Sequence, residues 1–207
     1  GYPSFSYFVF EQVYDAAGVP IEGLYVDRNG DGTVTPDDMY RYKKAAPDAT
    51  FGFYTGVNLG NFDLSLGARA MVGNYVYNNN LASQGVYDFV YNSSGGTGGG
   101  YLNNVDSQTE ALDINTPRYF SDHYVQDGSF LRIDHITAGY DFGNIGSAIS
   151  SFRLSITAQN PLLITGYDGI DPEIAARDIT SNSVGFGIDN NIYPRSRTFL
   201  LGLNVKF

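Results

Sequence analysis

The residues best suited to chemistry lie in an acidic loop at residues 27–38, which reads DRNGDGTVTPDD. Counted as a twelve-residue calcium loop, it carries Asp or Asn at the first, third and fifth positions and Gly at the sixth. Its last position is Asp, where such loops usually have Glu. Oxygen ligands on a tight turn suit a hard cation, and the alternative is an ion-free loop held by Asx turns. The predicted Ca²⁺ ligands are Asp27, Asn29, Asp31, Thr33 and Asp38.

Catalytic arrangements are weak. His123 and His135 lie far from any serine of hydrolase type, and the sequence has no cysteine. The acids Asp168, Asp171 and Glu173 have spacings that resemble glycosidase carboxylate pairs. Acidic residues in loops are usually solvated, so we predict that the chain is not an enzyme.

Aromatic residues in the polar middle of the chain are a second set of candidates. They could stack on sugars or pack on a lid protein, and the alternative is that they pack within their own loops. These residues are Tyr87, Phe89, Tyr91, Tyr101, Tyr119 and Phe120.

Composition favours strands and argues against several classes of protein. The 207 residues suit one all-β domain, with 15% aromatic residues, 25 Gly and only 16% charged residues. A formal net charge of −10 argues against a nucleic-acid partner, which requires a basic surface. No apolar run reaches the length of a membrane helix.

Alternation of apolar and polar residues predicts six strands. The last stretch, TFLLGLNVKF, places Phe199, Leu201 and Leu203 on one parity. In the strand near residue 130 the apolar parity switches at Asp134–His135, which predicts a β-bulge. The predicted strands cover residues 2–14, 51–59, 62–77, 128–142, 151–160 and 198–207. A short helix at 37–44, capped by Thr35, is also possible.

The connections alternate between short turns and long loops, which is typical of outer-membrane barrels. We therefore predict an all-β, transmembrane, antiparallel up-and-down β-barrel over residues 1–207, with extracellular loops at about 15–49, 79–127 and 163–194. Six strands would leave two open edges, so the chain must pair with further strands. On this register the polar face is turned to the lumen. The residues predicted to line the lumen or substrate path are Arg69, Arg132, Arg153 and Gln159.

Several stretches resemble SusC-like TonB-dependent receptors of Bacteroidetes outer membranes. They are GLYVDRNGDGTVTPDD, FDLSLGARAMVGNYVYN, DGSFLRIDHITAGYDF, TAQNPLLITGYDGIDPE and YPRSRTFLLGLNVKF, in the order of the family. The segment 81–119 lies outside this resemblance.

The resemblance implies a barrel of about 22 strands around a plug, of which this chain would supply the last six. It also implies uptake of oligosaccharides or peptides, powered by TonB, with a SusD-like lipoprotein over the extracellular loops. The family's plug domain and TonB box have no counterpart in this sequence, so we expect the chain to act as one segment of a larger receptor in the outer-membrane lipid.

Two other functions remain open on sequence grounds. One is a passive porin or adhesin barrel, and the other is a soluble, calcium-stabilised carbohydrate-binding β-module. The substrate, glycan or peptide, is not specified by any readable motif.

Overall fold

The chain forms two compact units in a computed structural model that describes residues 1–92, 100–174, 185–190 and 193–207. Unit 1 combines Gly1–Ala46, Asn74–Gly128 and Tyr167–Tyr193. Unit 2 combines Pro47–Gly73, Ser129–Gly166 and Pro194–Phe207.

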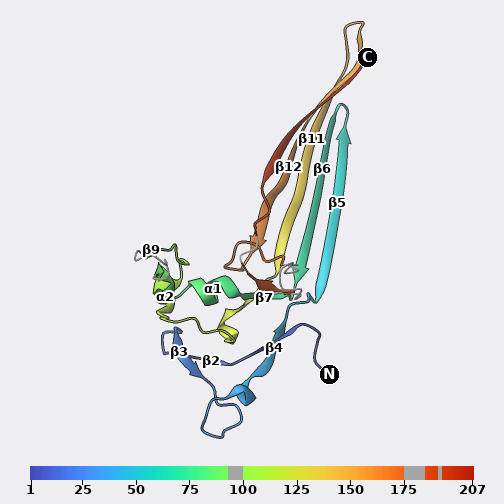
Figure 1. The fold of residues 1–207 in the computed structure, drawn as a ribbon. Coiled ribbons are helices and arrows are strands. Elements are labelled where there is room, and N and C mark those ends of the chain that lie inside the picture. Colours follow the sequence, from blue (N-terminus) through green and yellow to red (C-terminus); the bar gives the residue numbers. More distant parts are fainter. Residues whose placement is uncertain (93–99, 175–184, 191–192) are drawn as a thin grey trace. The chain divides into compact units, whose positions relative to one another are not determined.

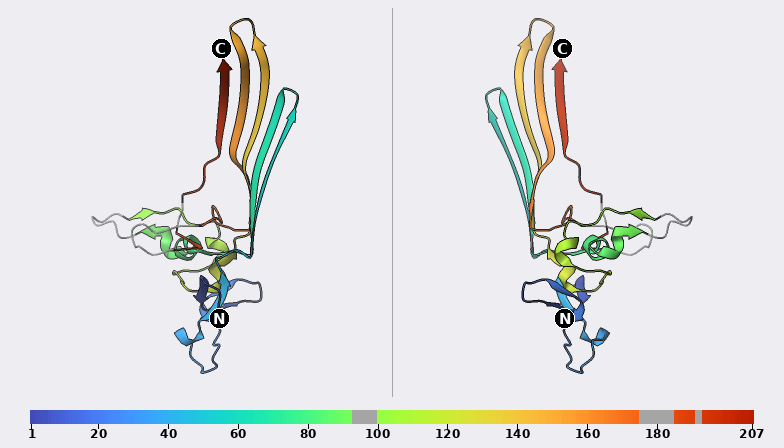
Figure 2. Two further views of the ribbon diagram at one scale, coloured as in Figure 1. Left: turned by 90° about the vertical axis from the view of Figure 1, so that its right-hand side faces the viewer. Right: turned by 90° about the vertical axis from the view of Figure 1, so that its left-hand side faces the viewer.

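Unit 2 is a five-stranded antiparallel sheet with the order β14-β12-β11-β6-β5 (Figure 1). Both views in Figure 2 show the C-terminal strand at one edge and the hairpin of β5 and β6 at the other. The strands are β5 (Ala49–Leu59), β6 (Phe62–Val72), β11 (Phe130–Ile145), β12 (Ile149–Thr165) and β14 (Thr198–Lys206). These five correspond to predicted strands, and the antiparallel, neighbour-to-neighbour pairing confirms the predicted up-and-down order.

Short turns join the strands at one end of the sheet and long connections leave the other end. Gly60 and Asn61 close the β5–β6 hairpin, and Gly60 has a φ of +62°, which glycine adopts without a Cβ clash. Residues 146–148 close the β11–β12 hairpin. The predicted alternation of short and long connections is therefore confirmed for these strands.

The bulge predicted in β11 is also present. The register against β6 shifts between Ile133 and His135, so Asp134 is an extra residue. This shift places Leu131 and Ile133 on the same face as Ile136 and the residues that follow it, despite their opposite parity.

Unit 1 is a compact assembly of short elements. Its strands are β1 (Ser6–Val9), β2 (Gln12–Tyr14), β3 (Pro20–Tyr25), β4 (Tyr40–Lys44), β7 (Tyr75–Asn78), β8 (Tyr91–Asn92), β9 (Tyr101–Leu102), β10 (Val125–Asp127) and β13 (Ile188–Asp189). Its helices are α1 (Asn79–Gln84), α2 (Tyr87–Val90), α3 (Thr109–Leu112) and the 3₁₀ turns η1 (Pro36–Asp38) and η2 (Asp122–Tyr124). No helix in the described part of the chain is long and apolar enough to cross a membrane.

The core of unit 1 draws on segments that the sequence presents as separate loops. Buried residues from β1, β7, α1 and the region of η2 form one cluster. Its members are Tyr7, Val9, Ala45, Tyr77, Leu81, Ala82, Val86, Leu112, Ile114, Tyr124 and Val125.

The first predicted strand, residues 2–14, differs in the structure. It forms β1 and β2, which pair with β4 and β3 in unit 1 and not with the five-stranded sheet. Phe5, at a φ of +61°, interrupts the extended backbone. Gln12 is buried, and its side chain donates to the carbonyls of Ile21 and Leu24. A buried side-chain amide needs hydrogen-bond partners, which unit 1 supplies to Gln12. Such a residue fits this assembly better than a strand of a barrel wall that faces lipid.

The predicted helix at 37–44 is shorter than expected. Thr35 is its N-cap and Pro36 its first residue, as predicted, but η1 ends at Asp38. The following residues form β4, in which Tyr40 and Tyr42 pack against the core. The alternation of Tyr with basic residues suits a half-buried strand better than a helix.

Candidate functional site

One face of the five-stranded sheet is apolar along its whole length. The cross-strand register aligns apolar side chains from neighbouring strands in continuous rows. Two complete rows are Val57–Leu64–Ala138–Ile156–Leu201 and Leu59–Phe62–Tyr140–Leu154–Leu203. Further rows run through Leu66–Ile136–Ala158–Phe199, Phe53–Ala68–Ile133–Leu162 and Phe51–Ala70–Leu131–Ile164.

This apolar face is exposed. Phe53 is 61% exposed, Phe199 72% and Leu201 75%, although each lies within regular strand. From Phe51 to Leu59 the rows extend about 26 Å along the strand, at about 3.3 Å per residue. With a tilt of about 40°, the band would be about 20 Å tall, close to the apolar band of about 25 Å on transmembrane barrels.

Aromatic rings gather toward the turn end of the apolar face. The Tyr140 and Phe142 rings lie 4.8 Å apart, and the Phe142 and Phe152 rings lie 5.5 Å apart. Phe62 lies opposite Tyr140 in the β6–β11 register. Aromatic residues at one border of an apolar band are typical of the interface girdle of a transmembrane barrel.

The opposite face is polar and carries an ion pair that crosses a strand. The Arg153 guanidinium donates from Nε and Nη2 to the two carboxylate oxygens of Asp63, at 3.1 and 2.7 Å. Asp63 is on β6 and Arg153 on β12, so the pair passes over Gly139 of β11. A Cβ at Gly139 would overlap with the ends of both side chains, which explains the glycine at this position.

A second crossing occurs at Gly67. The His135 ring lies over this glycine and faces Tyr54, at 6.0 Å between ring centroids. Nearby, Arg69 Nε lies 3.1 Å from an Asp134 carboxylate oxygen. The polar face therefore has ordered charges and rings across four strands.

The register brings the predicted lumen residues together on this face. Arg69 is the cross-strand partner of Arg132, and Gln159 is the partner of His135. Arg153 lies on the same face, toward the turn end. Their role in a lumen or substrate path stays a prediction.

The predicted calcium loop holds itself together through its own side chains. Asp27 accepts from the backbone N–H groups of Gly30 and Gly32, both at 2.7 Å. Asn29 Oδ1 and Asp31 Oδ1 each accept from the N–H two residues further on, at 2.8 Å.

The Asp38 carboxylate is held mainly by backbone N–H groups. Its carboxylate accepts from the N–H groups of Thr35, Asn29 and Arg28 at 2.8 to 3.1 Å. These bonds, that from Thr35 first, hold the Asp38 pKa below its usual value. Across the described residues no three acidic or histidine side chains converge as a metal site. Calcium binding by this loop stays a prediction.

A second carboxylate network joins distant parts of unit 1. Glu22 of β3 accepts from the backbone and side chains of Asn115 and Thr116, and from Arg118 Nη2 at 3.0 Å. These bonds, led by the Asn115 backbone N–H, lower the pKa of Glu22 to about 2. The network explains how the segment after α3 is fixed to β3.

His123 and the loop acids have structural environments in unit 1. His123 Nδ1 lies 3.2 Å from the Tyr14 hydroxyl, and burial lowers the pKa of His123. Asp168 is hydrogen-bonded with Gln126, and Asp171 accepts from the Glu173 backbone N–H. None of these contacts forms a nucleophile–base arrangement.

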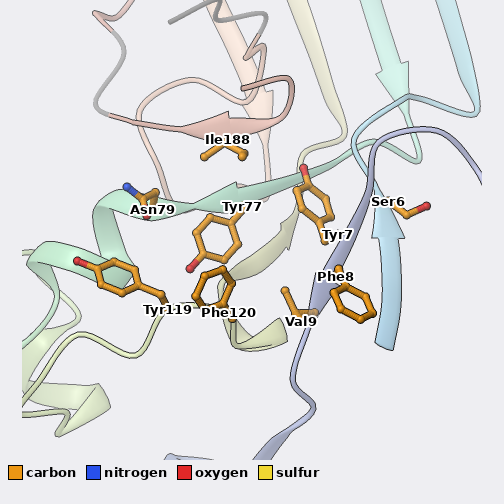
Figure 3. A pocket seen from close by; sticks show the side chains of 9 residues that line it. All are labelled: Ser6, Tyr7, Phe8, Val9, Tyr77, Asn79, Tyr119, Phe120 and Ile188. Carbon is orange, nitrogen blue, oxygen red and sulfur yellow. The ribbon is translucent and has the colours of Figure 1, made fainter. Parts of the chain in front are cut away.

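Two of the predicted loop aromatics line a pocket. Tyr119 and Phe120 lie beside residues of β1 and β7 around a pocket of ≈ 410 Å³ (Figure 3). The remaining lining residues are Ser6, Tyr7, Phe8, Val9, Tyr77, Asn79 and Ile188. The other candidate aromatics, Tyr87, Phe89, Tyr91 and Tyr101, do not line it. Sequence reasoning missed Tyr7 and Tyr77 because their contact with the loop spans distant segments.

Comparison with known proteins identifies the class. The chain is 40% identical over 217 residues to the TonB-dependent receptor SusC of Bacteroides thetaiotaomicron, covering 100% of this chain and 20% of that protein. It is 31% identical to the TonB-dependent receptor P3 of Formosa agariphila, over 89% of this chain and 19% of that protein. No protein-family model matches.

Solved structures agree on the fold. The RagAB peptide importer in its closed-closed state superposes with a TM-score of 0.65 at 23% identity, covering 100% of this chain and 23% of that chain. The sheet and these relatives place the chain among the TonB-dependent receptors. Within that class it belongs to the SusC-like receptors, as a C-terminal segment of the barrel. The chain spans 20% of the length of its SusC relative.

Proposed function

We propose that this chain forms part of the wall of an outer-membrane receptor that imports oligosaccharides or peptides with energy from TonB. The exposed, continuous apolar face of the five-stranded sheet carries the proposal. Such a face is unfavourable in water and suits contact with lipid, while the polar face suits a lumen.

The open edges of the sheet favour a larger barrel. In the part of the chain that the structure describes, β5 and β14 each pair with a strand on one side and not on the other. Unpaired backbone groups cannot face lipid, because no water is there to bind them. We propose that both edges pair with further strands of the same receptor, whose plug occupies the lumen beside Arg69, Arg132, Arg153 and Gln159.

The partners follow from the same proposal. A SusD-like surface lipoprotein would cover the extracellular part, and TonB would act on the plug. The names of the relatives support a TonB-dependent receptor. The lipoprotein partner and the substrate class are proposed in addition.

Uptake by the full receptor in its host tests this function. We expect the receptor to fractionate with the outer membrane, to need detergent for extraction, and to support substrate uptake that stops when TonB is deleted. A monodisperse receptor without detergent would contradict a membrane role and favour the soluble carbohydrate-binding module. Uptake that persists without TonB would favour a passive porin.

A further inference from the structure

The pocket beside β1 has an apolar floor and an exposed aromatic rim. Tyr7, Val9 and Tyr77 are less than 10% exposed and form the floor. Tyr119 and Phe120 are 46% and 59% exposed and stand at the rim. Figure 3 shows Tyr7, Val9, Tyr77 and Phe120 grouped on the same side of β1, with the Phe8 ring on the other side. Four rings around ≈ 410 Å³ are enough to enclose one large side chain.

Three polar side chains of this pocket are already engaged within the protein. The Tyr7 hydroxyl lies 2.8 Å from the carbonyl oxygens of both Tyr75 and Gly187. Ser6 Oγ donates to the Pro3 carbonyl, and Asn79 Nδ2 donates to Asn190 Oδ1. A sugar that entered would lose hydrogen bonds to water and find few replacements, whereas an apolar group would lose none.

The backbone of Phe120 adopts a strained conformation, and this strain does not serve to bury the ring. Its φ is +69°, in the left-handed region that a bulky side chain rarely adopts. The conformation is held by a hydrogen bond from the Phe10 N–H to the Phe120 carbonyl, while the ring stays 59% exposed. Strain that places an exposed ring at the rim of a pocket suggests a role in binding.

We infer that this pocket binds an aromatic or large aliphatic side chain of a peptide. The inference rests on the proposed function, because it selects the peptide from the two substrate classes named there. The floor would take the side chain by apolar burial, and Tyr119 and Phe120 would pack around it. An oligosaccharide is disfavoured by the engaged polar groups.

Calorimetric titration of the full receptor in detergent tests the inference. The probe is a hexapeptide of alanines with one phenylalanine, and the comparison ligands are the same peptide with serine in place of phenylalanine and a linear hexasaccharide. We expect the phenylalanine peptide to bind and Phe120→Gly to weaken its binding about tenfold, which corresponds to the loss of one ring contact.

Two controls separate binding from folding. Glycine accepts a positive φ, so Phe120→Gly should keep the unfolding temperature of the receptor. Tyr91→Ala removes an equally exposed ring, 55% against 59%, that does not line the pocket, and should leave binding unchanged.

Several results would overturn the inference: no binding of the phenylalanine peptide, equal binding of the serine peptide, or wild-type affinity in Phe120→Gly. Binding of the hexasaccharide that Phe120→Gly weakens would make the pocket a sugar platform instead. A measurement of uptake distinguishes failure of this inference from failure of the proposed function. If TonB-dependent import is present and Phe120→Gly has no effect, only the pocket assignment fails. If import is absent and the peptide still binds through Phe120, the importer function fails and the binding site remains.

Discussion

The two units of this chain place their apolar residues in opposite ways. Unit 1 buries Tyr7, Leu81 and Tyr124 to 9% exposure or less in a closed core. The five-stranded sheet leaves Phe53, Phe199 and other large apolar residues more than half exposed. Both contain regular hydrogen-bonded strands, so the difference lies in what the side chains contact.

This difference indicates the surroundings that would stabilise each unit. Full burial of a large apolar side chain stabilises a fold by about 1.5–3 kcal/mol, and unit 1 gains this within its own core. Among the described residues, no other strand of unit 2 forms a second layer over the apolar rows of the sheet. It is expected to gain the same stabilisation only when lipid covers the face and further strands pair with its edges.

A charge on the apolar face should have the largest effect. Ile156→Arg places a cation in the row next to the middle of that face and should cost about 2–4 kcal/mol, because arginine at this depth would face lipid. We expect folded receptor in the outer membrane, measured by heat-modifiable gel mobility, to fall strongly. Thr157→Arg, one residue away on the polar face, should be tolerated. Equal loss in both variants would contradict the assignment of the two faces.

Filling the crossing point of the ion pair should have a smaller effect. Gly139→Ala would push the Arg153 and Asp63 side chains apart and lower the free energy of unfolding, but by less than a charge on the apolar face does, because the pair is exposed to solvent. The measurement is denaturant unfolding of the receptor in detergent. Gly52→Ala is the matched control, because a Cβ there meets nothing within 4 Å. If both variants were equally stable, the ion pair would contribute nothing to the sheet.

The Glu22 network should make unit 1 sensitive to acid. The folded-state pKa of Glu22, about 2, is below its ordinary value, so its stabilisation is present above about pH 4.5 and is lost as the pH falls toward 2. We expect about 1 kcal/mol from this group, allowing for screening by solvent. Hydrogen exchange at the amides of Asn115 and Thr116 should quicken between pH 5 and pH 2.5 (after correction for intrinsic rates), and Glu22→Gln should flatten this dependence. An unchanged pH profile in Glu22→Gln would assign the acid sensitivity to other groups.

Calcium should also have a small effect. Chelation by the loop at 27–38 must replace hydrogen bonds that its side chains already make, so any site is weak. We expect calcium at a few times its dissociation constant to stabilise unit 1 by about 1 kcal/mol, measured as slower hydrogen exchange in the loop. Asp31→Asn should abolish the response, and magnesium should not reproduce it. If calcium did not slow hydrogen exchange in the wild-type loop, the prediction would be wrong and the loop would be stable without an ion.

Local patterns predicted the sheet well. Alternation marked all five of its strands, and the parity switch at Asp134 marked the bulge, because a side chain's face depends on its neighbours in sequence. Thr35 and Pro36 likewise marked the start of η1. Residues 2–14 misled for the same reason: their alternation is strand-like, and nothing local shows that β1 pairs with β4.

The sequence by itself determined which stretches form the wall, which of their faces is apolar, and the family to which the chain belongs. Only the tertiary structure decided that the N-terminal strands and the long connections share one core, and that Tyr119 and Phe120 meet Tyr7 and Tyr77. The physical reason is distance along the chain. Strand periodicity is set by adjacent residues, whereas the Arg153–Asp63 pair joins side chains 90 residues apart and exists only once the strands have aligned.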